Sequence, residues 1–372
     1  MNGSFKASQI DSQAMIKIMI LLPIVLVLWV MSSPLMAQQH AIILQYHHIA
    51  ENTPFITTTK PELFLWQMDY LQREGYRILP LSAVVEAFKS GEQLPQKTVV
   101  ITFDDAYKSI YKNAFPILKE KMFPFSFFIN TKSVGRGENH LNWQQILEME
   151  NSGAEILNHS FSHTHLNRIK RGETNQQWKQ RVRQDIETAQ DTITHFTGST
   201  QKIIAFPYGE YSLQLIELIR EMGYSGVGQQ SGPAASEFSL EALPRFPMGG
   251  NYGKPSVFIE KLNTLPMPLE KAPIVEPLVI DEKPKLRLQF KTSGKINLNN
   301  LNCYVSGQGK AKIDLISNQA VVQAVQPLST GRNRYNCTMP AYKNEDSKTM
   351  FYWFSQLWLV PDKNGNWYKE YQ

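Results

Sequence analysis

The amino-acid sequence predicts an α/β fold, an irregular (β/α)7-type barrel with a C-terminal small antiparallel β domain. Between residues 41 and 228, short apolar segments alternate with segments of helical periodicity, as in a parallel sheet covered by helices. Beyond about residue 265 apolar and polar residues alternate instead, as in half-buried strands. A proline-rich segment at residues 265–277 separates the two patterns. An open doubly wound sheet is the alternative for the first part.

The elements of the first part follow from the spacing of apolar residues. Strands are expected where β-branched and aromatic residues form short runs, at residues 41–46, 98–103, 124–130, 154–157, 202–206 and 224–228. Helices are expected where apolar residues recur every three or four positions, at residues 61–74, 107–121, 143–151, 175–196 and 212–222. Gly75 and Gly198 follow two of these helices, and glycine commonly ends a helix. Roughly seven such units fit a barrel.

The last quarter of the chain has the pattern of a small β-sandwich-like domain, expected over residues 278–372. Alternating strands are predicted at residues 285–291, 320–324 and 351–360, with turns rich in asparagine and glycine between them. Cys303 and Cys337 both lie here, and in an exported protein such a pair indicates a disulfide. Two unpaired thiols are the alternative.

The N-terminal 37 residues have the features of a secretory signal peptide or an N-terminal anchor. Lys6 and Lys17 precede an apolar run at residues 18–31, and Ala37 precedes a polar segment. We therefore expect an exported protein, periplasmic, attached to the cell envelope or secreted, with membrane association if the segment is retained. The net charge of +5 is dispersed over the 372 residues, so no nucleic-acid partner is expected.

Polar side chains gather just after four of the predicted strands. These positions are His47 and His48, the pair Asp104 and Asp105, the segment at residues 158–165, and the segment at residues 207–209. In parallel α/β folds, the carboxyl ends of the strands form the active site. The sequence therefore predicts a site that combines carboxylates and histidines.

The composition of this predicted site favours a metal ion. His159 and His163 are four residues apart, a spacing at which two imidazoles on one helical turn share a metal. Asp104 and Asp105 should point to opposite sides of their strand, so one could complete a two-histidine, one-carboxylate site while the other takes a proton from water. A helix N-cap is the alternative for the acidic pair, and His165 is expected to be a loop residue or a supporting partner.

Three motifs here resemble those of the polysaccharide deacetylase (NodB-homology, carbohydrate esterase family 4) group. They are Thr-Phe-Asp-Asp at residues 102–105, His-Ser-x-x-His at residues 159–163 and Phe-Pro-Tyr-Gly at residues 206–209. They come in the family order over roughly residues 40–250, within a deacetylase domain expected at residues 40–265. The resemblance implies that Asp104 is the general base and that Asp105, His159 and His163 hold a divalent metal, Zn or else Co, Ni or Fe. It further implies that the Tyr208 backbone N–H binds the oxyanion.

The chain departs from the family pattern at two positions. An arginine usually stands two residues before the proline of the third motif, but this chain has Ala205, which puts the orientation of the base in doubt. No histidine follows His195, although the family usually supplies its general acid from a later Leu-x-His. The sequence resembles the circularly permuted subgroup that deacetylates poly-β-1,6-N-acetylglucosamine, whose acid histidine lies on the first strand. We therefore expect His47, rather than His48, to be the general acid.

The expected function is metal-dependent hydrolytic N-deacetylation of an N-acetylhexosamine-containing polysaccharide, a poly-N-acetylglucosamine-like exopolysaccharide. An O-acetyl esterase acting on a glycan such as xylan would use the same site. A metal-dependent amidase of small ring substrates and a catalytically weak glycan-binding protein are further alternatives. Trp353, Trp358 and Trp367 could form a sugar platform in the β domain, or could be buried in its core.

Overall fold

The computed structural model describes residues 1, 3, 40–292, 296–344 and 347–368. The predicted signal peptide or anchor at residues 1–37 lies outside the described residues, apart from residues 1 and 3. Among the described residues, no helix combines the length and the apolar character that a membrane span requires.

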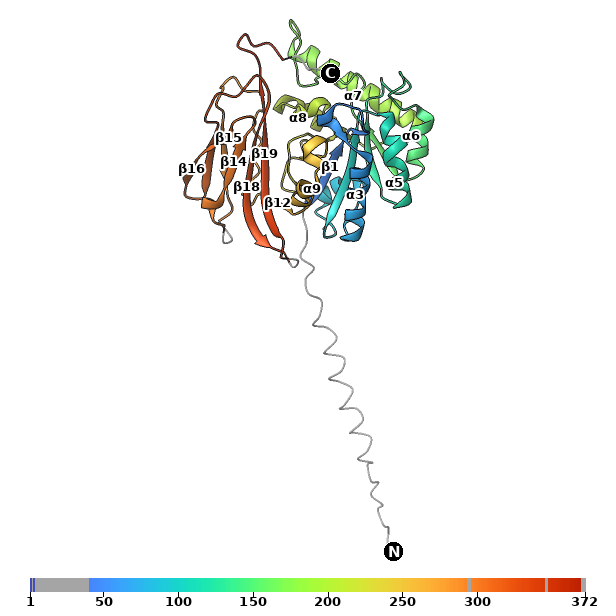
Figure 1. Ribbon diagram of the computed structural model, residues 1–372, viewed down its shortest axis with the longest axis horizontal. Helices are drawn as coiled ribbons and strands as arrows, with labels where there is room; N and C mark the ends of the chain where they lie inside the picture. The colour runs from blue at the N-terminus through green and yellow to red at the C-terminus, as the bar shows by residue number, and fades with distance from the viewer. Residues whose placement is uncertain (2, 4–39, 293–295, 345–346, 369–372) are drawn as a thin grey trace. The chain divides into compact units, whose positions relative to one another are not determined.

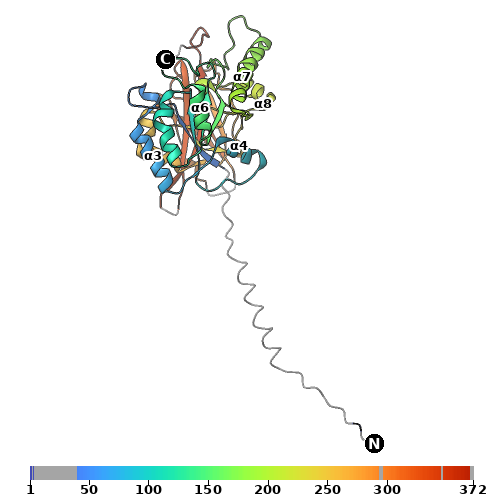
Figure 2. The ribbon, with the colours of Figure 1, turned by 90° about the vertical axis from the view of Figure 1, so that its right-hand side faces the viewer.

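A curled parallel sheet occupies the first part of the chain (Figures 1 and 2). Its parallel strands lie side by side in chain order: β1 (His40–Tyr46), β5 (Thr98–Asp104), β6 (Phe125–Ile129), β7 (Ala154–Asn158), β8 (Ile203–Ala205) and β9 (Ser225–Val227). Each of these strands begins and ends within one residue of its predicted range.

One short segment joins the two edges of this curl. Leu243 forms a parallel bridge with Val227 of β9, and three residues later β11 (Phe246–Pro247) pairs with Leu44 of β1. The predicted α/β barrel is thus confirmed, and it is irregular because its closing strand is so short. Two smaller pairings complete the sheet: β4 (Arg77–Ile78) on β5 and β10 (Ala234–Ala235) on β1. Strands β2 (His48–Ile49) and β3 (Thr58–Thr59) form a separate two-stranded sheet.

Helices follow most of the parallel strands and surround them (Figure 2). They are α3 (Pro61–Arg73), α4 (Leu81–Ser90), α5 (Phe115–Glu120), α6 (Trp143–Glu150), α7 (Asn175–Thr197), α8 (Leu213–Glu221) and α9 (Pro255–Leu262). The predicted helix at residues 107–121 is wrong in its first half, where a π-helical turn, η2 (Ile110–Ala114), precedes α5. Pro116 lacks the N–H that a regular helix would use there, so the ladder of hydrogen bonds changes register.

Alternation along the strands divides the barrel interior from its outer layer. Ile43 of β1 packs with Val100 of β5 and Phe128 of β6 in one buried cluster. Their neighbours Leu44 and Ile101 belong to a second cluster, which includes residues of α3 and α5. The inward row of β5 continues through Thr102 to Asp104, so the register of a buried strand carries a carboxylate into the barrel interior.

Two sheets form the C-terminal part of the chain, and all their strand pairs are antiparallel except the parallel pair of β12 with β19. One has the order β12-β19-β18-β14-β15 and the other β13-β17-β16. Their bounds are β12 (Thr264–Pro266), β13 (Lys285–Gln289), β14 (Asn302–Val305), β15 (Gly309–Lys310), β16 (Lys312–Ile316), β17 (Gln319–Gln323), β18 (Gly331–Lys343) and β19 (Thr349–Val360). Residues of both sheets share one buried cluster that includes Leu288, Val322 and Trp358, as in a sandwich.

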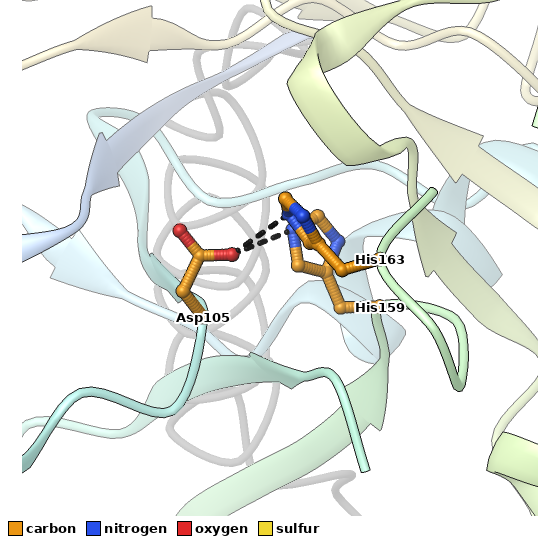
Figure 3. A group of neighbouring side chains, drawn as sticks. All are labelled: Asp105, His159 and His163. Atoms are coloured by element: carbon orange, nitrogen blue, oxygen red, sulfur yellow. Dashed lines mark ion pairs between the residues drawn. The ribbon is translucent and has the colours of Figure 1, made fainter. Parts of the chain in front are cut away.

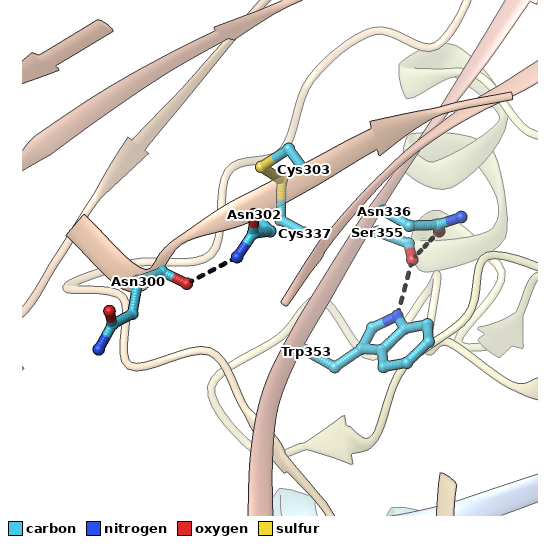
Figure 4. The surroundings of a disulfide bond; sticks show 7 residues. All are labelled: Asn300, Asn302, Cys303, Asn336, Cys337, Trp353 and Ser355. Carbon is cyan, nitrogen blue, oxygen red and sulfur yellow. Dashed lines mark hydrogen bonds between the residues drawn. A yellow bond between two sulfur atoms is a disulfide. The ribbon is translucent and has the colours of Figure 1, made fainter. Parts of the chain in front are cut away.

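The predicted disulfide is present and links two neighbouring strands. Cys303 of β14 lies directly opposite Cys337 of β18, and the two are bonded (Figure 4). Both side chains are buried in the sandwich core. The bond therefore fastens the edge half of the five-stranded sheet to its long central hairpin.

Strand β19 has two buried faces. Trp358 belongs to the sandwich core, whereas Leu357 and Leu359 pack with Trp178 of α7 and Phe206 beyond β8. Residues 38–372 form one compact unit. The division into domains at residues 40–265 and 278–372 therefore stays a prediction.

Candidate active site

The polar residues singled out in the sequence lie at the carboxyl ends of β1, β5, β7 and β8. Because these strands are parallel neighbours, their carboxyl ends open on the same end of the barrel. Asp104 ends β5, and Asp105 follows with a φ of 77°. That left-handed conformation interrupts the extended backbone of the strand. Asp104 Oδ2 lies 3.8 Å from His47 Nε2, whereas Asp105 Oδ1 lies beside His159 and His163. The expectation that the two carboxylates have different roles stays a prediction.

Asp105, His159 and His163 form a compact cluster (Figure 3). The Asp105 Oδ1 atom lies 3.2 Å from His159 Nε2 and 3.0 Å from His163 Nε2. Burial alone would raise the pKa of Asp105, but the two imidazoles hold that pKa well below its usual range. The cluster is thus a place where one negative oxygen faces two ring nitrogens.

The donor atoms of this cluster fit a divalent metal ion. Ligand atoms around a tetrahedral zinc ion are about 3.3 Å apart, close to the separations in the cluster. The buried Asp105 Oδ1 accepts no hydrogen bond of normal geometry, although two ring nitrogens face it. His159 Nδ1 lies 2.8 Å from the Ala205 carbonyl oxygen, so the proton of a neutral ring belongs on Nδ1 and the Nε2 lone pair is left for a ligand bond.

Asp104 is fixed by two side chains that lie far from it in sequence. Arg245 donates from Nη1 to Oδ1 and from Nη2 to Oδ2, each at 2.8 Å, and both side chains are fully buried. Gln45 Nε2 donates to Oδ2, also at 2.8 Å. Burial would raise the pKa of Asp104, but the positive charge and hydrogen bonds of Arg245, with the charges of His159 and His47, lower it to about 2. Asp104 is therefore held as a carboxylate in one orientation.

His47 and His48 have different surroundings. His47 Nε2 lies 3.8 Å from Asp104 Oδ2, and its side chain is 18% exposed. Burial lowers the pKa of His47, and the charges of Asp104 and Asp105 offset this effect in part. The His48 ring instead packs at a tilt against the Tyr107 ring, with centroids 3.8 Å apart. Of the two histidines, His47 is the one paired with Asp104.

A tight turn carries Tyr208. In the 3-10 turn η3 (Pro207–Gly209), Tyr208 has φ 61° and ψ 4°, a left-handed conformation that costs a residue with a side chain about 1–2 kcal/mol. The Tyr208 ring stacks on His165 at 4.0 Å and contacts His163 at 4.8 Å. Gly209 is required beside it, because a Cβ there would lie 2.5 Å from the Gln229 side chain.

Sequence reasoning missed Arg245 and Gln45. Arg245 supplies the guanidinium that the family pattern places at the position of Ala205, but it comes from the segment that closes the barrel. The sequence signal for Arg245 was its position between Leu-Pro and Phe-Pro, an apolar setting that indicates a buried side chain. A buried guanidinium needs a carboxylate partner, so this position pointed to an ion pair. Gln45 was visible as the inward-facing polar residue of an otherwise apolar strand.

The three C-terminal tryptophans are not gathered on one surface. Trp358 is 1% exposed within the sandwich core. Trp353 packs edge-on against Phe246 with centroids 5.4 Å apart. Trp367 lies against the guanidinium of Arg168 at 4.7 Å. They contact three different regions, which favours packing over a shared sugar platform.

Comparison with known proteins places this geometry in a family. A family model described as polysaccharide deacetylase matches residues 91–227. The Bacillus subtilis protein YxkH, named as a candidate polysaccharide deacetylase, is 30% identical over 204 residues, which are 55% of this chain and 69% of YxkH. This chain belongs to the polysaccharide deacetylase family. The predicted enzyme class is thereby confirmed.

Other deacetylases show the same likeness. The poly-β-1,6-N-acetyl-D-glucosamine N-deacetylase of Escherichia coli strain K12 is 27% identical over 229 residues. The match takes in 52% of this chain but about a third, 34%, of that enzyme. The solved structure of the Streptococcus pyogenes deacetylase PplD, in complex with acetate, matches with a TM-score of 0.54 and 25% identity, over 60% of this chain and 98% of PplD.

Proposed function

We propose that this polysaccharide deacetylase performs metal-dependent, hydrolytic N-deacetylation of a poly-N-acetylglucosamine-like exopolysaccharide. The observation that carries the proposal is a buried, Arg245-clamped carboxylate, Asp104, beside the Asp105–His159–His163 cluster. The first supplies a fixed proton acceptor, and the second supplies the ligands of a divalent ion. Together they are what hydrolysis of an unactivated amide requires.

Asp105, His159 and His163 would hold the ion, with zinc as the first choice and cobalt, nickel or iron as the others. When bound, the ion would supply Lewis acidity toward the acetyl oxygen and lower the pKa of water. The direction of the His159 pKa shift supports this assignment. Although burial lowers the pKa of His159, contacts with Asp105 and the charge of Asp104 raise it overall. A site that raises a histidine pKa is one that attracts positive charge.

Asp104 would accept the proton of the attacking water. Its Oδ2 already accepts from both Gln45 and Arg245, whereas Oδ1 accepts from Arg245 Nη1. A carboxylate oxygen has two lone pairs, so Oδ1 keeps one for the proton. The water oxygen then bonds to the acetyl carbon, the carbon–nitrogen bond breaks, and acetate leaves.

His47 would give a proton to the departing nitrogen. It directly follows β1, lies beside Asp104 and remains partly open to solvent, so it can contact the substrate and take up a new proton from water. The Tyr208 backbone N–H would stabilise the oxyanion as it forms. The left-handed turn supports this role, since it holds the Tyr208 backbone at the mouth of the barrel beside His163.

The proposed substrate rests on the names of the relatives and on the position of the proposed general acid, His47, directly after the first strand. The Escherichia coli relative is named for poly-β-1,6-N-acetyl-D-glucosamine, as is that of Staphylococcus aureus strain MRSA252, which is 26% identical and of which this chain covers 64%. Such a polymer lies outside the cell membrane, so we also propose that residues 1–37 direct export or anchor the protein. Residues 40–265 would form the catalytic domain, and residues 278–372 would form a smaller β domain.

Acetate release from a panel of glycans tests this proposal. The panel holds poly-β-1,6-N-acetylglucosamine, chitin oligomers, peptidoglycan fragments and acetylated xylan, and the variant is Asp104→Asn. We expect release from the first polymer and a loss of at least about 100-fold in kcat for the variant. Asp69→Asn is the matched control, because Asp69 lies on α3 with a side chain 51% exposed. Equal rates for wild type and Asp104→Asn, or release from acetylated xylan alone, would refute the proposal.

A further inference from the structure

The C-terminal strands reach the active site through one buried carboxylate. Glu210 follows the turn that carries Tyr208, and its side chain is fully buried. From the barrel side it accepts hydrogen bonds from His165 Nδ1 at 2.8 Å and from Arg168 Nη2 at 3.0 Å. From the C-terminal part it accepts from Arg332 Nη1 at 3.2 Å and from the Tyr368 hydroxyl. Groups from two distant parts of the chain thus share one anion.

The residues around Glu210 also hold the ring of Tyr208. His165, the Glu210 partner, stacks on one side of the Tyr208 ring with centroids 4.0 Å apart and an interplanar angle of 15°. The guanidinium of Arg332, which also donates to Glu210, lies 5.9 Å from the Tyr208 ring centroid. Glu210 therefore ties together the groups that contact Tyr208, and β18 contributes one of them.

The last described residues of the chain contact Arg168, another residue that donates to Glu210. Arg168 Nη1 donates to the Tyr368 carbonyl oxygen at 3.1 Å. The Arg168 guanidinium also lies 4.7 Å from the Trp367 ring and 4.5 Å from the Tyr368 ring. Two aromatic rings and a carbonyl thereby keep Arg168 on Glu210, and such contacts gain strength where water is excluded.

The left-handed conformation of Tyr208 needs such support. A residue with a side chain adopts αL at a cost of about 1–2 kcal/mol, and it stays there only where its surroundings fix it. We infer that Arg332 and Tyr368 are positioning residues of the active site. They hold Glu210, and Glu210 holds the Tyr208 turn, so the C-terminal β part completes the oxyanion site instead of serving as a glycan-binding module. This inference rests on the proposed role of the Tyr208 N–H.

The test uses the full chain and the variants Arg332→Gln and Tyr368→Phe. Matched controls are Arg287→Gln on an exposed position of β13 and Tyr342→Phe, whose residue is 56% exposed. For each protein, kcat and KM on a short N-acetylglucosamine oligomer, bound metal per chain and the melting temperature are measured. Tyr368→Phe keeps the ring on Arg168 and removes a single hydroxyl, so it should fold even if Arg332→Gln does not.

We expect kcat to fall about tenfold in Arg332→Gln and in Tyr368→Phe. Complete loss of an oxyanion donor costs about 100- to 1,000-fold, and the loss is smaller here because these substitutions displace the Tyr208 turn without removing its N–H. KM should stay within about twofold and bound metal should not change. Arg332→Lys should recover part of kcat, since its ammonium can still pair with Glu210. The double variant should lose less than the product of the single losses, since both act through Glu210.

Four outcomes would overturn the inference. A lower melting temperature with normal kcat would make the contacts purely structural. A raised KM with normal kcat would make the C-terminal part a glycan-binding module. Wild-type acetate release that does not depend on Asp104 would remove the proposed function, and the inference with it. If acetate release depends on Asp104 but Arg332→Gln and Tyr368→Phe keep the wild-type kcat, the inference alone is refuted and the proposed function stands.

Discussion

Replacing Arg245 with methionine should impair both folding and catalysis. Arg245 and Asp104 are each fully buried and share two contacts of 2.8 Å. No solvent can replace the lost guanidinium, so Arg245→Met leaves a buried charge whose remaining neutral donor is Gln45. Removing one partner of a buried ion pair destabilises a protein by about 3–5 kcal/mol. An exposed pair, such as that of Arg183 with Glu187 on α7, is worth about 0.2–1 kcal/mol.

The same substitution should change the chemistry of Asp104. Burial raises the pKa of Asp104, and Arg245 is the largest of the groups that lower it to about 2. Without Arg245 the pKa should rise, and the carboxylate should lose its fixed orientation. We expect kcat to fall about 100-fold or more, within the range that general-base catalysis contributes.

A double-mutant cycle measures this interaction. Denaturant unfolding is followed for wild type, Arg245→Met, Asp104→Asn and the double variant, with Arg183→Met as the control. The double variant should be no less stable than Arg245→Met alone, which corresponds to a coupling of about 2–3 kcal/mol. A coupling below about 0.5 kcal/mol, together with a normal kcat for Arg245→Met, would refute the reasoning.

Three further outcomes are expected. A chelator should abolish acetate release and one divalent ion per chain should restore it, whereas His163→Ala should lower the metal content itself; full activity in metal-free protein would contradict this. Replacing Cys303 and Cys337 with alanine should lower the free energy of unfolding by about 4 kcal/mol for a loop of this length, given the separation of 34 residues; an unchanged melting temperature would argue against it. Burial raises the pKa of Glu210, but hydrogen bonds led by that of His165 lower it from 4.5 to about 2. The Glu210 carboxylate should thus stabilise the fold above pH 4.5, by about 3 kcal/mol, and lose that contribution as the pH falls toward 2. Wild type should therefore lose stability over this pH interval more steeply than Glu210→Gln. If the melting temperatures of the two proteins fall equally with pH, the proposed role of the Glu210 carboxylate is contradicted.

Elements with a strong local pattern could be predicted from the sequence, and weaker ones could not. The parallel strands were visible because they are buried on both faces and so apolar throughout. Strand β12 was not, because it runs into the proline-rich segment, and Pro266 is accommodated where the strand pairs with β19 at the edge of the sheet. Strand β18 was missed because polar Asn333 interrupts the apolar residues of its buried face and Pro340 lies at a register shift.

The sequence by itself determined the residues that directly follow the strands. His47, Asp104, Asp105, His159 and Tyr208 could be named because a strand fixes where its last side chains go, and parallel strands end together. These are local relations, and a motif of a few residues records them.

Only the tertiary structure decided what holds those residues in place. Arg245 is separated from Asp104 by 141 residues and Tyr368 from Glu210 by 158. Such contacts depend on the closure of the barrel and on the packing of β18 and β19 beside it. No local spacing encodes either relation, because a buried charge requires a partner of opposite charge and not a partner at a given distance along the chain.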